Sequence, residues 1–166
     1  MFETVLYLMA FLAVCLLVIR RELFKRPIFF AILFVIGAIG SIFFEYPLIS
    51  VGLWTHLVYP QILGVSWFAA LMYIPFLGIS YALGKALSKM LSQNEYVMFF
   101  ISGMIVGFVI DLTSVALGFY RYNFTFPFAI GGVPLGITVA EGIAVSVVIL
   151  ISFWLSGIFS KIIKRK

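Results

Sequence analysis

Five long apolar runs, separated by short connections, limit what this chain can fold into. They cover approximately residues 3–19, 28–52, 62–84, 97–119 and 131–159. A helix that crosses a bilayer needs about 20 mostly apolar residues. Of the 166 residues, 64% are hydrophobic and only 10% are charged, whereas about a quarter are charged in a soluble domain. We therefore predict one all-α domain, a polytopic bundle of about five transmembrane helices in the cell membrane.

The basic residues predict how the spans are oriented. Ten of the eleven fall after the first run, after the third run and in the C-terminal tail: Arg20, Arg21, Lys25, Arg26, Lys85, Lys89, Lys161, Lys164, Arg165 and Lys166. Five spans put these places on one side and leave Arg121 alone on the other. Cytoplasmic loops are rich in Lys and Arg, so we expect the N-terminus outside and the C-terminus in the cytoplasm. Charges at the ends of apolar runs also argue against nucleic acid as a partner.

The first run has no basic residue before it and no small-residue cleavage site after it. A cleaved signal peptide carries both. We expect this run to remain in the protein as a span.

The second and fourth runs resemble each other at an offset of 66 residues. Three pairs carry small or acidic side chains: Gly37 and Gly103, Ser41 and Gly107, Glu45 and Asp111. Residues 52–56 (GLWTH) likewise correspond to residues 118–122 (GFYRY). We predict a parallel two-helix repeat over residues 28–84 and 97–159, with the first span unpaired.

Small residues at every fourth position share one helical face and let helices pack closely in lipid. Gly103, Gly107, Asp111, Ser114 and Gly118 form such a face in the fourth run. The acids share these faces, so we expect them to point into the bundle.

Three acids, Glu45, Asp111 and Glu141, fall inside predicted spans. A charged side chain in the bilayer centre costs at least about 2.5–3.5 kcal/mol, so such residues are functional by default. Asp111 and Glu141 both lie about 12–15 Å from the outer end of their spans, at 1.5 Å per residue. We expect the three to share one pocket in a largely protonated state, where a carboxylic acid can act as a general acid. The alternative is that each holds helices together by hydrogen bonds.

Aromatic residues surround the acids in the sequence. Trp54, Trp67, Tyr120 and Tyr122 flank the outer ends of the spans. Tyr73 corresponds to Glu141 in the repeat, because the offset becomes 68 after the outer loop. These residues, with His56 of the outer loop, are our candidates for substrate binding, because aromatic faces stabilise a cation within about 6 Å. The alternative is an aromatic belt at the membrane surface.

Other catalytic signatures are missing from the sequence. It has no phosphate-binding Gly-rich loop with Lys, no HExxH and no GxSxG, so phosphate hydrolysis, ATP use and zinc proteolysis are not expected. One cysteine and one histidine exclude a disulfide and a Cys/His metal cluster. We expect no metal and no cofactor.

Residues 44–73 (FEYPLISVGLWTHLVYPQILGVSWFAALMY) and 110–142 (IDLTSVALGFYRYNFTFPFAIGGVPLGITVAEG) both read as an acid, a Gly-apolar-aromatic triplet, an aromatic loop and a Gly-Val entry into a helix. They resemble the integral-membrane carotenoid-biosynthesis proteins, which include carotenoid hydratases and lycopene cyclase domains. The cyclase domains usually carry Pro-x-Glu-Glu at the start of a helix, whereas Pro134 here is followed by no acid until Glu141.

The resemblance implies a redox-neutral enzyme acting on a long apolar isoprenoid or carotenoid. Asp111 or Glu141 would protonate a carbon–carbon double bond, and aromatic faces would shield the resulting cation. Capture by water gives a tertiary alcohol, as in a hydratase, and capture by a neighbouring alkene gives a ring, as in a cyclase.

Two other hypotheses stay open at this stage. The chain is small enough to be the substrate-binding membrane subunit of a vitamin-type transporter, and its small-residue faces would suit a partner membrane protein or a second copy. It could also be a structural partner without a pocket, in which case the intramembrane acids would be dispensable.

Overall fold

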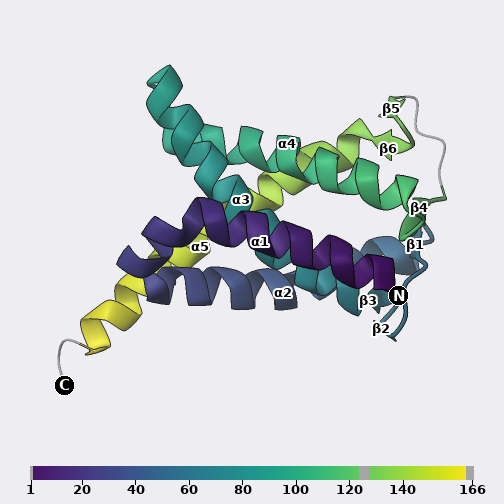
Figure 1. Ribbon diagram of the computed structural model, residues 1–166, viewed down its shortest axis with the longest axis horizontal. Helices are drawn as coiled ribbons and strands as arrows, with labels where there is room; N and C mark the ends of the chain where they lie inside the picture. Colours follow the sequence, from purple (N-terminus) through teal and green to yellow (C-terminus); the bar gives the residue numbers. More distant parts are fainter. Residues whose placement is uncertain (1, 124–127, 164–166) are drawn as a thin grey trace.

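The computed structural model describes residues 2–123 and 128–163, and five long helices dominate it (Figure 1). They are α1 (Phe2–Lys25), α2 (Pro27–Ser50), α3 (Trp67–Leu91), α4 (Glu95–Ala116) and α5 (Leu135–Ile163). Each is long and apolar enough to cross a membrane. The predicted architecture of about five long apolar helices is confirmed at this level.

Two predicted helix starts are wrong, because short β-hairpins precede α3 and α5. Strands β2 (Gln61–Ile62) and β3 (Val65–Ser66) form the first hairpin, and β5 (Ala129–Ile130) and β6 (Val133–Pro134) form the second. Both central residues of each two-residue turn have positive φ, which gives a tight hairpin turn. The helices therefore begin at Trp67 and Leu135 rather than at 62 and 131.

A third small sheet joins the two connections that precede these hairpins. Strand β1 (Trp54–His56) pairs antiparallel with β4 (Tyr120–Tyr122), and Thr55 lies opposite Arg121 at the centre of the register. The all-α description thus has to include three two-stranded sheets. Figure 1 shows these strands and the N-terminus at one end of the bundle and the C-terminus at the other. After α1, the order helix, strand, hairpin, helix occurs twice.

Helix α3 packs against α1, α2 and α4, whereas α5 packs mainly against α4 and α2. Gly103 of α4 lies against Val145 and Gly142 of α5, and Phe29 of α2 stacks on Phe153 of α5 with ring centroids 4.5 Å apart. These contacts hold the first half of α5 close to α4 and its second half close to α2.

The predicted small-residue faces are buried, with one exception. The buried members are Gly37, Ser41, Glu45, Gly103, Gly107, Asp111 and Ser114. Gly118 is exposed and lies beyond the end of α4, where its φ of 71° turns the chain toward β4. Its assignment to the packing face was wrong because the helix ends at Ala116.

Candidate functional site

A cavity lies inside the bundle beneath the β1–β4 sheet. Four helices and both strands contribute to its wall. Eight of the nine predicted site residues line it: Glu45, Trp54, His56, Tyr73, Asp111, Tyr120, Tyr122 and Glu141. The rest of the wall is mostly apolar and includes Phe44, Phe68, Met72, Phe76 and Ile110. We call this space the central cavity.

Trp67, the ninth predicted residue, does not line the central cavity. Its indole N–H donates a hydrogen bond to the Tyr59 carbonyl oxygen, 3.1 Å away. Trp67 is also the first residue of α3, so its position is fixed by the hairpin that precedes the helix. This hydrogen bond connects the start of α3 to the loop between α2 and α3.

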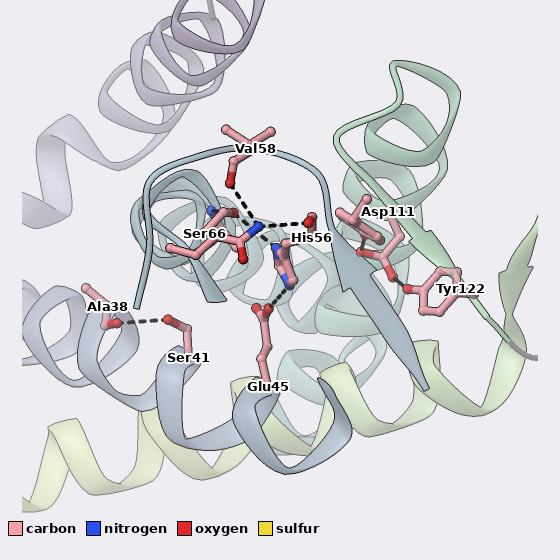
Figure 2. Close-up of polar contacts among 11 residues, drawn as sticks. Ala38, Ser41, Glu45, His56, Val58, Ser66, Asp111 and Tyr122 are labelled. Atoms are coloured by element: carbon pink, nitrogen blue, oxygen red, sulfur yellow. Dashed lines mark hydrogen bonds and ion pairs between the residues drawn. The ribbon is translucent and has the colours of Figure 1, made fainter. Parts of the chain in front are cut away.

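Asp111 is held by two tyrosines from β4. The Tyr120 hydroxyl donates to Oδ1 and the Tyr122 hydroxyl to Oδ2, so each carboxylate oxygen has its own donor. Figure 2 shows the contact between Tyr122 and Asp111. The turn at Gly118 brings β4 back over the end of α4 and makes this contact possible. Burial raises the pKa of both phenols, so they stay protonated and remain donors.

Glu45 and His56 form a second polar group, extended by Ser66 (Figure 2). Glu45 Oε2 lies 2.6 Å from His56 Nε2. The two atoms are close, but the contact does not have the alignment of a hydrogen bond. On the other side of the ring, His56 Nδ1 lies 3.0 Å from Ser66 Oγ. His56 is 4% exposed.

Glu141 is different, because its Oε2 atom is buried and has no hydrogen-bond partner among the described residues. The side chain projects from α5 against Gly107 of α4 and is 8% exposed. A carboxyl group buried without a partner is more stable when protonated than when ionised. Its neighbourhood therefore favours the acid form.

Sequence reasoning missed Ser66. Its hydroxyl oxygen accepts the Ala69 N–H at 3.1 Å and caps the start of α3. A serine directly before an apolar run is a helix-start signal, but the predicted span includes residues 62–66 and so hides it. The contact with His56 leaves no trace in the sequence, since it depends on the hairpin.

The central cavity contains three carboxyl groups, and no Lys or Arg is among the residues that line it. Such a cavity disfavours phosphates and carboxylates and suits an apolar or cationic ligand. Within the described ranges, no group of three His, Cys, Asp or Glu side chains has the arrangement to hold a metal ion. Comparison of the chain with known protein families, characterised proteins and solved structures found no match.

Proposed function

We propose that this protein is a membrane-embedded, redox-neutral enzyme that adds a proton to a carbon–carbon double bond of a long apolar isoprenoid or carotenoid. Water or a neighbouring alkene then captures the cation. The observation that carries this proposal is the Glu141 carboxyl group, which lies in the wall of an aromatic cavity and whose buried Oε2 atom has no hydrogen-bond partner among the described residues. The resemblance to carotenoid-biosynthesis proteins supports the same chemistry.

Glu141 is the proton donor in this proposal. Its acid form is favoured by burial without a partner, and a positioned acid typically accelerates proton transfer by about 10²–10⁴-fold. The π electrons of the alkene form the new carbon–hydrogen bond, which leaves a tertiary cation on the neighbouring carbon and an ionised Glu141.

Asp111 and the aromatic residues stabilise that cation. Asp111 accepts the hydroxyls of Tyr120 and Tyr122, and two such donors stabilise its ionised form. In this proposal, unlike the protonated state expected from the sequence, Asp111 therefore presents a negative charge without reorganising during the reaction. Trp54 packs edge-on against Tyr122 with ring centroids 5.6 Å apart, and both line the central cavity. Aromatic faces attract cations most strongly where water is excluded.

The same proposal includes an internal repeat, with α2–α3 and α4–α5 as its two copies. Its support is the repeated order of elements and the β1–β4 register, in which Thr55 faces Arg121, its own counterpart at the offset of 66. A two-fold axis along the membrane normal would pass between these residues and through the central cavity. The bias of basic residues supports an N-terminus outside the cell membrane and a cytoplasmic C-terminus.

A second candidate is a binding subunit that captures a small organic cation for a transporter. The observation in its favour is the combination of three carboxyl groups with tyrosine and tryptophan rings in one cavity. Aromatic cages of this kind recognise quaternary ammonium groups. This function predicts tight binding of a stable cation, a partner protein and no change in the ligand.

Expression in a host that makes an acyclic carotenoid tests the proposal. Mass spectrometry of the pigments should find a product heavier by one water for a hydratase, or a product of equal mass with a shorter-wavelength spectrum for a cyclase. Glu141→Gln should abolish either product. Glu3→Gln, which removes an exposed acid at the start of α1, is the matched control. Unchanged pigment in a strain with abundant wild-type protein would contradict the enzyme function for that substrate.

A further inference from the structure

We propose that Glu45, His56 and Ser66 form a proton relay that accepts the proton released when water attacks the cation. The chemical role rests on the proposed function, whereas the geometry of the relay rests on contacts in the structure. Glu45 and His56 line the central cavity, and Ser66 lies behind His56 at the start of α3.

The contacts of Ser66 suggest where the protons of the relay lie. Ser66 Oγ accepts the Ala69 N–H at 3.1 Å and lies 3.0 Å from His56 Nδ1, so its own hydrogen can point to Nδ1. In the arrangement that we propose, Nδ1 is the acceptor and the ring hydrogen is on Nε2, the atom that lies 2.6 Å from Glu45 Oε2. Ser66 is 1% exposed, so bulk water cannot replace its hydroxyl.

In the proposed step the Glu45 carboxylate, which lines the cavity, takes up one proton. His56 Nε2, 2.6 Å from Glu45 Oε2, is the second position that can hold this proton. If it resides on the ring, Nδ1–H donates to the second lone pair of Ser66 Oγ, because a hydroxyl oxygen accepts two hydrogen bonds. The three residues therefore stay connected in both protonation states.

The other polar residues around His56 do not offer the same capacity. Asp111 of α4 already accepts one tyrosine hydroxyl on each oxygen. Tyr120 of β4 lies beside the imidazole, with ring centroids 5.6 Å apart, and is itself a donor to Asp111. Glu141 of α5 has just lost its proton in the first step of the proposed reaction. Glu45 with His56 is thus the proton acceptor that the cavity provides.

The steps balance without any oxidant or reductant. Glu141 gives its proton to carbon, a lone pair of water forms the carbon–oxygen bond, and an oxygen–hydrogen bond of that water breaks as Glu45 takes the proton. The sum is addition of one water to the alkene. Transfer of the proton from Glu45 to Glu141, which line the same cavity, restores the starting state.

Nitrogen-15 NMR tests the geometry of the relay directly, because the chain contains a single histidine. Labelled histidine in proteoliposomes near neutral pH should give one protonated Nε2 signal and one hydrogen-bonded acceptor signal from Nδ1. Ser66→Ala should convert these into an average of two tautomers, and Ser66→Thr, which keeps a hydroxyl, should restore them. Ser80→Ala removes a buried hydroxyl within α3 that has no hydrogen-bond partner in the described part of the chain, and should leave them unchanged. A hydrogen on Nδ1 in the wild type, or no effect of Ser66→Ala, overturns the relay.

The pigment assay tests its chemical role. Glu45→Gln and His56→Gln should lower formation of the hydrated product by about 10²–10⁴-fold, the usual contribution of a general base. Wild-type rates in both variants, with folded protein, overturn the role of the relay even if Glu141→Gln is inactive. If the wild-type protein changes no pigment, both the proposed function and the chemical role of the relay are contradicted. The NMR measurement still decides whether the hydrogen bonds of the relay exist.

Discussion

Gly107 of α4 faces the Glu141 carboxyl group of α5 so closely that a Cβ atom at position 107 would overlap both Oε2 and Cδ. The absence of a side chain at Gly107 is therefore what gives the carboxyl group its place in the cavity wall. Gly107→Ala should displace the carboxyl group and abolish any activity that depends on Glu141. Overpacking costs about 1–3 kcal/mol, partly offset by about 1 kcal/mol of better helix propensity, so the bundle should remain folded.

Gly40→Ala is the matched control for this substitution. Gly40 lies in the middle of α2, and a Cβ there would meet nothing within 4 Å. We expect full activity and a stability equal to or up to about 1 kcal/mol above that of the wild type, measured by thermal unfolding in detergent together with the pigment assay. Equal activity of the two variants would contradict the role of Gly107.

The two tyrosines that hold Asp111 should be energetically coupled to it. Tyr122→Phe leaves one carboxylate oxygen buried without a donor, and a hydrogen bond to a charged group contributes about 1.5–3 kcal/mol. In an Asp111→Asn background the same substitution should cost less, since the charge is gone. A double-mutant cycle on unfolding free energies measures this coupling, and Tyr46→Phe, on an exposed face of α2, is the control. An equal loss of unfolding free energy in the two backgrounds would contradict a stabilising interaction between Tyr122 and Asp111.

The same tyrosines predict how stability depends on alkaline pH. Burial raises the pKa of Tyr120 and Tyr122 above the ordinary value of 10.0, so only the unfolded chain ionises them when the pH passes that value. Their contribution to stability is complete below pH 10 and is lost as the pH rises above it. Unfolding temperatures measured at increasing pH should fall less steeply for Tyr122→Phe than for the wild type. Parallel curves would show that this phenol is not protected in the fold.

The sequence predicted which residues share the site but not how they pair. The common depth of Glu45, Asp111 and Glu141 could be derived from span length and the repeat, and all three line the central cavity. The pairing of Glu45 with His56 could not, because it depends on the β1–β4 register. That register sets His56 opposite Tyr120, whereas the repeat alone aligns it with Tyr122.

The hairpins before α3 and α5 were missed for a related reason. Their residues are as apolar as those of the spans, so hydropathy extended the predicted helices through them. The glycines were the local signal that could have revealed these turns. Gly64 and the Gly131–Gly132 pair supply the positive φ that tight turns require. Because Ser66 follows the first of these turns, hydropathy alone could not predict its contact with His56.

One hydrogen bond should stabilise the packing of helix α1 at the end of the bundle that holds the central cavity. The Tyr7 side chain of α1 is hydrogen-bonded to Thr113 of α4, and its ring packs against Phe119 with centroids 5.5 Å apart. Tyr7→Phe keeps the ring and removes the hydroxyl, so it should cost about 0.6–2 kcal/mol, the range for hydrogen bonds between membrane helices. Tyr59→Phe, at an exposed loop position, is the control. An unfolding temperature of Tyr7→Phe equal to that of the control would contradict the contact.

The proposed orientation can be tested with single cysteines at the two ends of the bundle. Leu57 follows β1 and is 45% exposed, and Gln93 is exposed between α3 and α4. In intact cells, a membrane-impermeant maleimide should label Leu57→Cys at once and Gln93→Cys only after lysis. The native Cys15 is 1% exposed, so wild-type protein provides the unlabelled background. The reverse pattern would place the central cavity in the cytoplasmic half of the membrane and contradict the orientation inferred from the basic residues.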